Sequence, residues 1–236
     1  MDVDNCLILN LEIRKDRWEK LKNFRKMWEN KNKTCEKING IDYKDKKNII
    51  EDFLMNKRLH AYGTGFRSNK KHFIGELGCY MGHYKCWEHI VKNNMQCCLI
   101  LEDGIEILRT DFDNLIINAD TDILFVNKEM VKNSFNKLIG HGALGYIVTL
   151  NGARKLMEKC YTLHLPIDLQ IRNLCNTKEL NSNVLNNSYF KRNSLSISSI
   201  SNTFYDGTNL NDKQNMEPII FRIINKLQQN NIKLDI

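Results

Sequence analysis

The stretch Cys97-Cys98-Leu99-Ile100-Leu101-Glu102-Asp103-Gly104 decides the fold class of this chain. A run of five apolar residues is typical of a short strand that is buried on both faces of a sheet. Burying an unpaired carboxylate is costly, so we expect the chain to leave the sheet at Glu102 and Asp103. In open α/β sheets, ligands bind at the carboxyl ends of the strands. The stretch therefore predicts an α/β fold with two acids at the ligand-binding edge, and the alternative is a strand that ends in a solvated acidic turn.

Length and composition are those of a globular protein. The 236 residues fit one α/β domain or two small ones, and the hydrophobic share of 42% and charged share of 27% are ordinary. No apolar stretch approaches the roughly 20 residues of a transmembrane helix. The acidic start, Met1-Asp2-Val3-Asp4-Asn5, lacks the pattern of a secretory signal peptide. We therefore expect a cytoplasmic protein, and the abundance of Asn, Lys and Ile suggests a microbial or viral source with an AT-rich genome.

A net charge of +7 raises the question of nucleic-acid binding. The basic residues are mixed with acids, as in residues 14–20, which is more typical of a solvated face than of a phosphate track. The sequence contains neither paired zinc ligands nor an RNP motif. It therefore predicts no nucleic-acid partner, whereas a mildly basic surface suits a small ligand that carries a diphosphate.

The eight cysteines are scattered, and in a chain without a signal peptide we expect them to be free, mostly buried thiols. Cys79, His83, Cys86 and His89 offer metal-ligand types within one expected helix. Spacings of four and three place the first three on one face, but His89 drifts off that face. Because a closed zinc site needs ligands from more than one direction, we expect these residues to pack in the core or to meet a substrate.

Hydrophobic periodicity predicts strands that alternate with helices, which favours a parallel sheet. Residues 60–73 have the polar composition of a loop, and residues 181–202 are rich in Ser and Asn and are expected to be partly irregular. The expected strands are residues 6–11, 34–38, 97–101, 121–126 and 145–150, and the expected helices are residues 14–31, 49–59, 75–93 and 153–161, one that opens at residues 165–168, and residues 217–230.

Six short motifs follow one another between about residues 6 and 170. They are residues 8–11 with Arg14, Asp16 and Arg17; residues 38–42; residues 75–83; residues 99–103; residues 145–148 with Gly152, Ala153, Lys155 and Leu156; and Pro166-Ile167-Asp168. In this order and at these spacings the motifs resemble glycosyltransferase family 25, the group that contains lipooligosaccharide and procollagen galactosyltransferases.

The resemblance implies a GT-A-like fold, a Rossmann-type, mostly parallel sheet flanked by helices, which binds a nucleotide sugar at its carboxyl edge. We expect residues 1–204 to form this domain and residues 205–236 to form a C-terminal tail whose amphipathic helix packs on it. The implied reaction transfers a hexose, galactose or glucose, from a UDP-sugar to a hydroxyl of a glycan or protein acceptor. The resemblance also implies that the transfer inverts the configuration at the anomeric carbon and depends on Mn²⁺ or Mg²⁺.

The resemblance also implies roles for individual residues. Asp103, with Glu102 beside it, would hold the metal ion, which neutralises charge on the departing UDP. Asp168 would act as the general base or contact a sugar hydroxyl, and the alternative is that it caps a helix. The implied donor-binding residues are Asn10, Arg14, Arg17, Glu76, His83 and Glu102. Among these, the two arginines are alternatively surface charges and the histidine is alternatively a core residue.

Two positions depart from the family pattern. Gly104 stands where the family has a second Asp after Asp103, and Gly82 stands where it has a Ser before His83. The first change removes a carboxylate from the expected metal site, for which Glu106 would be a substitute ligand. The departures keep a second function open, a catalytically inactive family-25-like fold that binds a glycan or a partner.

Overall fold

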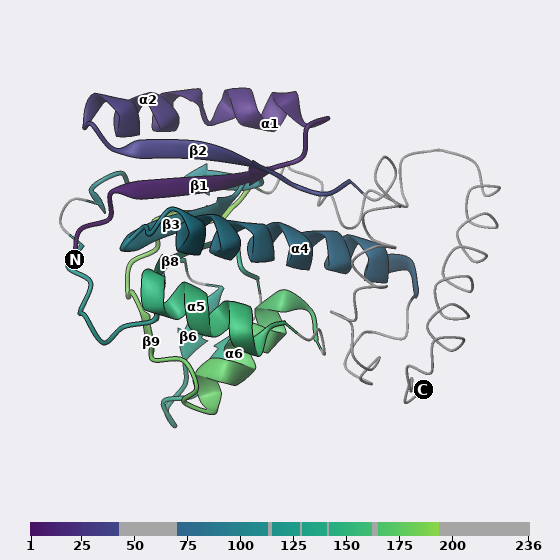
Figure 1. Cartoon of the computed structure of the whole chain (residues 1–236), viewed down its shortest axis with the longest axis vertical. Helices are drawn as coiled ribbons and strands as arrows, with labels where there is room; N and C mark the ends of the chain where they lie inside the picture. Colours follow the sequence, from purple (N-terminus) through teal and green to yellow (C-terminus); the bar gives the residue numbers. More distant parts are fainter. Residues whose placement is uncertain (43–69, 113–114, 128, 141, 162–164, 194–236) are drawn as a thin grey trace.

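The apolar stretch of the sequence forms β3 (Cys97–Glu102), an inner strand of a six-stranded sheet. The computed structural model describes residues 1–42, 70–112, 115–127, 129–140, 142–161 and 165–193 (Figure 1). The strands of this sheet follow the order β2-β1-β3-β8-β5-β9. The bounds of the other five are β1 (Asn5–Asn10), β2 (Thr34–Asn39), β5 (Ile123–Phe125), β8 (Gly145–Thr149) and β9 (Ser182–Val184).

Most strands of the described sheet run in one direction. β1 is parallel to β2 and β3, and β9 is parallel to β5, whereas β8 is antiparallel to both of its neighbours. This arrangement confirms the predicted α/β class and the mostly parallel sheet. The register pairs Leu9 with Glu102, and the N–H of Asp103 donates to the Leu9 carbonyl at 3.0 Å. The carboxyl ends of β1 and β3 therefore meet at one edge of the sheet.

Helices cover both faces of this sheet (Figure 1). Their bounds are α1 (Lys15–Lys20), α2 (Lys22–Asn30), α4 (Lys70–Lys92), α5 (Leu150–Lys159) and α6 (Ile167–Asn176). Trp28 of α2 belongs to the same core cluster as Leu101 of β3, whereas Trp87 of α4 shares the other cluster with Ile100. The sheet thus separates two cores, one beneath α2 and one beneath α4.

The alternation of side chains along β3 decides where the two acids go. Successive side chains of a strand point to opposite faces of a sheet. Ile100 faces the core beneath α4 and Leu101 faces the core beneath α2. Glu102 is therefore carried towards α4, and Asp103 is carried towards α1 and α2.

Several predicted elements differ in extent from the observed ones. The helix expected over residues 14–31 is divided at Leu21, whose N–H bonds the Trp18 carbonyl and whose side chain is buried. α4 begins at Lys70, so the end of the expected polar loop is helical. β5 is shorter than the expected strand, since Asp122 in front of it is bound to the Asn181 carbonyl through its main-chain N–H.

Two small two-stranded sheets were not predicted. They consist of β4 (Ile105–Ile107) with β10 (Phe190–Arg192), and of β6 (Met130–Lys132) with β7 (Leu138–Gly140). Strands of three residues carry too little alternation for a periodicity signal. The predicted helix at residues 49–59 and the tail at residues 205–236, with its helix at 217–230, lie outside the described residues.

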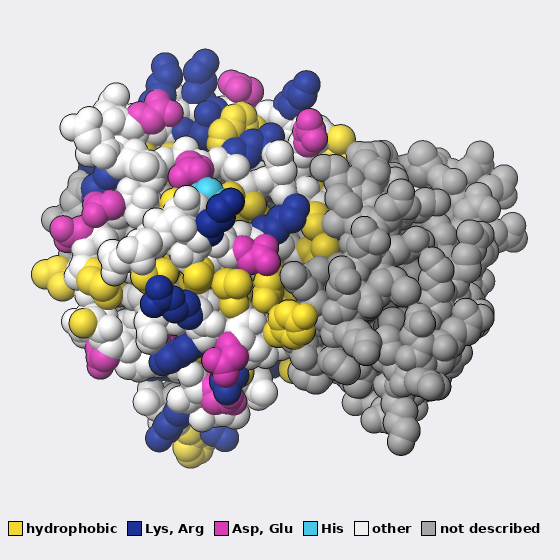
Figure 2. All heavy atoms as spheres, in the orientation of Figure 1, with side chains coloured by type: hydrophobic (Ala, Val, Ile, Leu, Met, Phe, Trp, Pro, Cys, Tyr) yellow, Lys and Arg dark blue, Asp and Glu magenta, His cyan; other side chains and the backbone are white. Residues whose placement is uncertain are grey.

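The surface shown in Figure 2 carries mixed charge, with Lys and Arg side chains interspersed among Asp and Glu. This agrees with the mixed pattern in the sequence. Among the helices that the structure describes, none has the length and apolar character needed to cross a membrane. All eight cysteines are free thiols and six of them are buried, as the sequence predicted.

Candidate active site at the carboxyl end of strand β3

Asp103 lies in a buried ion pair between β3 and the N-terminal motif. Its Oδ1 accepts a hydrogen bond from Arg17 Nη1 at 2.7 Å, and its Oδ2 accepts one from Asn10 Nδ2 at 2.7 Å. The side chains of Arg17 and Asp103 are only 6% and 9% exposed. Burial raises the pKa of the Asp103 carboxyl, and the Arg17 guanidinium acts in the opposite direction by favouring the ionised form. Each carboxylate oxygen thus accepts one hydrogen bond from a protein partner.

Asn10 connects this ion pair to the turn before α1. Its Nδ2 also donates to the main-chain carbonyl of Arg14 at 3.0 Å. The Arg14 guanidinium itself points to Asp16, with which it forms two hydrogen bonds of 2.9 Å. The structure therefore brings Asn10 and Arg17 of the predicted donor-binding set to Asp103, while Arg14 pairs locally instead.

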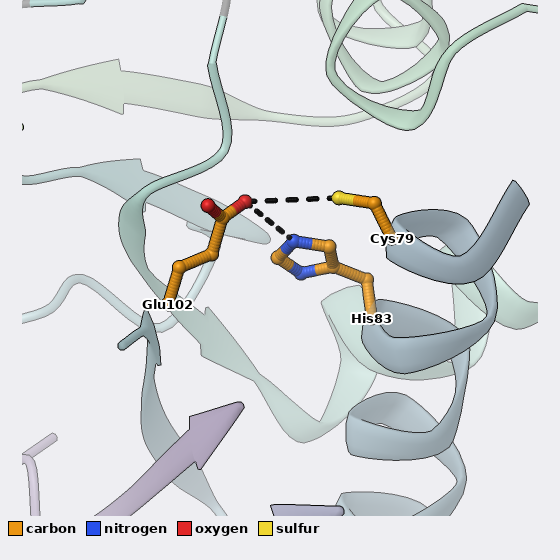
Figure 3. A group of neighbouring side chains, drawn as sticks. All are labelled: Cys79, His83 and Glu102. Carbon is orange, nitrogen blue, oxygen red and sulfur yellow. Dashed lines mark hydrogen bonds and ion pairs between the residues drawn. The ribbon is translucent and has the colours of Figure 1, made fainter. Parts of the chain in front are cut away.

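Glu102 joins a different network on the other face of the sheet (Figure 3). Its Oε1 lies 3.4 Å from His83 Nε2 and accepts a hydrogen bond from Cys79 Sγ at 3.7 Å. His83 is fully buried, and its Nδ1 lies 2.9 Å from the hydroxyl of Tyr146. Trp87 Nε1 donates to the same hydroxyl at 3.0 Å. A chain of polar contacts thus runs from Trp87 through the core to a carboxylate at the sheet edge.

The imidazole governs the charge of Glu102. Burial works against ionisation, but the interaction with His83, followed by smaller influences of Arg192 and Cys79, outweighs burial and lowers the pKa of the Glu102 carboxyl. Its side chain keeps 27% exposure, in contrast to the completely buried ring of His83. Glu102 is therefore an ionised carboxylate that faces both the protein interior and solvent.

Helix α4 supplies both Cys79 and His83 from one of its faces. Cys79 and His83 are four residues apart, which places them one above the other on a helix. The helix approaches β1 closely at Gly82, where a Cβ atom would lie 3.1 Å from Leu9 Cδ2. The glycine that replaces the family's serine thus permits the close contact that brings this face of α4 to Glu102.

Asp168 lies in the first turn of α6. It does not cap the helix, because the N-cap position is Pro166. Its Oδ2 accepts a hydrogen bond from the N–H of Gly142 at 2.7 Å and its Oδ1 one from the N–H of Leu169 at 3.0 Å. Burial, followed by the charges of Glu102 and Asp168, raises the pKa of the Cys79 thiol. The charge of Asp168 thus acts on the same thiol that donates a hydrogen bond to Glu102.

Two further predicted residues have other surroundings. Glu106 lies on β4, and its carboxylate is 3.0 Å from Lys191 Nζ on the partner strand β10. Glu76 lies one helical turn before Cys79 on α4 and adds to the charges that raise the pKa of the Cys79 thiol. Glu76 thus belongs to the surroundings of the Glu102 network, whereas Glu106 belongs to a separate pair of strands.

The predicted grouping of metal ligands and the observed one differ. Glu102 and Asp103 diverge to opposite faces and do not present their oxygens to one point. Within the described residues, the ligand types that do gather are those of Cys79, His83 and Glu102, whose ligand atoms all lie within 4.8 Å of one another. The sequence analysis also named Cys86 and His89 on the same helix. These two lie apart from the group, since Cys86 is buried in the core and His89 Nε2 lies 3.2 Å from a carboxylate oxygen of Glu36.

Tyr146 and Trp87 are the parts of the network that sequence reasoning missed. Tyr146 stands in the apolar strand β8, where only its hydroxyl distinguishes it from a core aromatic residue. Buried Tyr and Trp side chains usually find a partner for their polar atom. This tendency is the signal that could have suggested a polar contact, although not its partner.

Glu102, Asp103 and Arg17 thus lie at the carboxyl edge of an α/β sheet, which is where open sheets of this class bind ligands. A family model described as Glycosyltransferase family 25 (LPS biosynthesis protein) matches residues 3–139, more than half of the chain. The chain belongs to glycosyltransferase family 25.

Two relatives illustrate the similarity. A Glycosyltransferase 25 family member of Anopheles gambiae is 26% identical over 195 residues, which cover 71% of this chain and 31% of that protein. Procollagen galactosyltransferase 1 of Danio rerio is 25% identical over 178 residues, which cover 67% of this chain and 29% of that protein. The chain thus spans about a third of the length of the curated relatives that it matches.

A solved structure is also similar in outline. It is a crystal structure of a mutant Drosophila β1,4-galactosyltransferase 7 in complex with manganese, UDP-Gal and xylobiose. The TM-score is 0.42 at 8% sequence identity, and the match covers 85% of this chain and 79% of that one.

Proposed function

We propose that this protein is a glycosyltransferase that moves galactose or glucose from a UDP-sugar to a hydroxyl of a glycan or protein acceptor, with inversion. The observation that carries the proposal is the meeting of separate family motifs at one sheet edge. Arg17 of the first motif contacts Asp103, and His83 of the third contacts Glu102. Family membership and the names of the relatives support the reaction class.

In this proposal Arg17 and Asp103 act together at the donor. Guanidinium groups pair well with phosphate oxygens. The carboxylate of Asp103 holds Arg17 at the edge of the sheet through the 2.7 Å contact. Asp103 is then a positioning residue for a cation and not a direct ligand of the donor.

Asp168 is the proposed general base. Inverting transfer forms a bond between the acceptor oxygen and the anomeric carbon while the bond from that carbon to the phosphate oxygen breaks. The electron pair leaves with UDP, and the acceptor proton passes to a carboxylate within about 3 Å. Asp168 is held in one orientation by the N–H groups of Gly142 and Leu169, and its oxygens retain further lone pairs for that proton.

The implied Mn²⁺ or Mg²⁺ does not fit the residues that were expected to hold it. Such ions prefer several oxygen ligands around one point. Asp103 lies against the cation Arg17, Glu102 lies on the other face of the sheet and position 104 is glycine, so these residues do not bring several oxygens to one point. No step of the proposed transfer is therefore assigned to that ion.

The test is donor binding followed by turnover with the full chain. Thermal unfolding is followed with UDP, UDP-galactose and UDP-glucose, each with and without Mn²⁺, and release of UDP is then measured with glycan and collagen-like peptide acceptors. A donor at 100 times its Kd stabilises the fold by about 2.7 kcal/mol. We expect a shift with one UDP-sugar and acceptor-dependent release of UDP, and a chain that binds no UDP-sugar contradicts the proposal.

The role of Asp168 is tested separately. The substitution Asp168→Asn removes the base and should lower kcat by about 100-fold or more while donor binding persists. Asp111→Asn is the matched control, because that carboxylate pairs with Arg109 at the surface. If donor binds but no variant or wild-type chain transfers sugar, the inactive binding module is the correct function.

A further inference from the structure

Cys79, His83 and Glu102 place a sulfur, a nitrogen and an oxygen around one point (Figure 3). Zinc binds such atoms at about 2.0–2.3 Å, so two ligand atoms of a tetrahedral site lie about 3.3–3.7 Å apart. The oxygen of Glu102 is 3.4 Å from the nitrogen of His83 and 3.7 Å from the sulfur of Cys79. Both distances therefore match the separation between two ligand atoms in a tetrahedral zinc site.

We propose that Cys79, His83 and Glu102 form a zinc-binding site with one open coordination position. A thiolate, an imidazole and a carboxylate together suit Zn²⁺, whereas Mg²⁺ and Mn²⁺ favour sites made of oxygen. The ligands also come from two directions, two from α4 and one from the end of β3. A closed zinc site needs ligands from more than one direction, which a single helix cannot provide and which α4 and β3 provide together.

The surroundings of His83 are those of a metal ligand. In metal sites the second nitrogen of a ligating histidine is usually held by another group, which fixes the ring. Here Nδ1 lies 2.9 Å from the Tyr146 hydroxyl, which Trp87 holds from the other side. This leaves Nε2 directed at Glu102, and the sulfur of Cys79 lies within 4.8 Å of the other two ligand atoms. With zinc on Nε2, the N–H at Nδ1 donates to the Tyr146 oxygen and keeps the same orientation.

Three protein ligands leave a fourth position for water or for a substrate oxygen, as in catalytic zinc sites. Solvent reaches the site, because the Glu102 side chain is 27% exposed and Cys79 is only partly buried. The proposed ion lies on the α4 side of β3 and so is separate from Arg17 and Asp103. Its binding is therefore measured without any sugar donor, and failure of one proposal does not decide the other.

The experiment is titration of the metal-free full chain with Co²⁺ and then with Zn²⁺. Cobalt bound to a thiolate gives a sulfur-to-metal absorption band, which histidines elsewhere in the chain cannot produce. We expect this band at one ion per chain and its loss when Zn²⁺ displaces the cobalt. The absence of the band, or of any Zn²⁺ binding, overturns the proposal without recourse to a variant.

Variants then locate the site. Cys79→Ser should abolish the band, and Tyr146→Phe should weaken Zn²⁺ binding about tenfold by freeing the ring of His83. The matched control is Cys35→Ser, since Cys35 is the other partly buried thiol and lies on β2. A band that persists in Cys79→Ser, or that disappears equally in Cys35→Ser, contradicts the assignment. Circular dichroism confirms that each variant is folded.

Discussion

The two acids at the end of β3 are neighbours in sequence but belong to opposite kinds of site. Asp103 meets a cation, and both of its oxygens accept hydrogen bonds of 2.7 Å in a pair that solvent hardly reaches. Glu102 meets an imidazole and a thiol through one oxygen and remains partly exposed. Asp103 therefore orients the guanidinium of Arg17, whereas Glu102 is a partly exposed carboxylate that can accept a further ligand.

The largest expected effect comes from breaking the buried ion pair. Arg17→Ala leaves the Asp103 carboxylate buried without its cation and should lower the free energy of unfolding by about 3–5 kcal/mol. Urea unfolding at neutral pH measures the loss. The double variant Arg17→Met with Asp103→Asn removes both charges and should regain most of it. A loss below about 1 kcal/mol in the single variant would show that the pair is not needed for stability.

The polar network of His83 and Tyr146 on the other face should respond less strongly. Tyr146→Phe removes one hydroxyl, which leaves Trp87 Nε1 and His83 Nδ1 without that partner in the core. Leaving buried polar groups without a partner costs about 1–3 kcal/mol, and we expect Tyr146→Phe to lower the free energy of unfolding by that amount. Tyr161→Phe is the control, because Tyr161 is 44% exposed and its change should stay within about 0.5 kcal/mol. Equal effects at the two tyrosines would mean that the hydroxyl of Tyr146 contributes nothing special.

This contrast explains what the sequence could and could not predict. The apolar run of β3 and the two acids after it indicated an α/β sheet and its functional edge, because burial excludes unpaired charge from a core. Strand alternation also implied that Glu102 and Asp103 face opposite sides, yet the family pattern favoured a shared metal ion. The partners Arg17 and Tyr146 lie 86 and 44 residues away from the acids they influence. Contacts at such separations are set by packing and leave no local pattern.

The elements that the sequence missed have a similar cause. The antiparallel insertion of β8 between β3 and β5 cannot be seen in an apolar run, since buried strands of either direction have the same composition. The break of the first helix at Leu21 coincides with burial of that side chain in the core beneath α2, and no helix-breaking residue stands there. Local propensity was overridden by tertiary packing at both places.

The pH dependence of stability should have opposite signs for the two acids. The pKa of Glu102 is lowered on folding, so its contribution is complete above its unfolded pKa of about 4.3 and is lost as the pH falls through the folded value. The pKa of Asp103 is raised, so its contribution is complete below its unfolded pKa of about 3.9 and is lost as the pH rises through the folded value. A fall in pH therefore removes the stabilising contribution of Glu102 and adds that of Asp103.

Urea midpoints between about pH 7 and pH 3 test this difference in sign. Glu102→Gln should flatten the decline of stability in acid relative to wild type, and Asp103→Asn should make it steeper. Each variant serves as the control of the other, because both replace a carboxylate by an amide at adjacent positions. If the two variants show parallel pH profiles, folding does not shift the pKa values of Glu102 and Asp103 in opposite directions.

The smallest expected effect lies at Arg14, whose pairing provides an exposed counterpart to that of Arg17. Hydrogen bonds from Arg14 lower the pKa of Asp16 to about 2, but the Asp16 side chain is 53% exposed. Its contribution is present above an unfolded pKa of about 3.9 and is lost as the pH falls through about 2.

Arg14→Ala should change the free energy of unfolding by less than about 1 kcal/mol, because water and salt screen an exposed pair. The pKa of Asp16, measured by NMR, should return towards about 3.9 in this variant. Donor binding gives the sharper result. If Arg14→Ala retains it and Arg17→Lys loses it, the buried guanidinium is the one that serves the ligand. The reverse outcome would move the donor site from the buried ion pair to the exposed turn, because only a guanidinium released from Asp16 could reach a phosphate there.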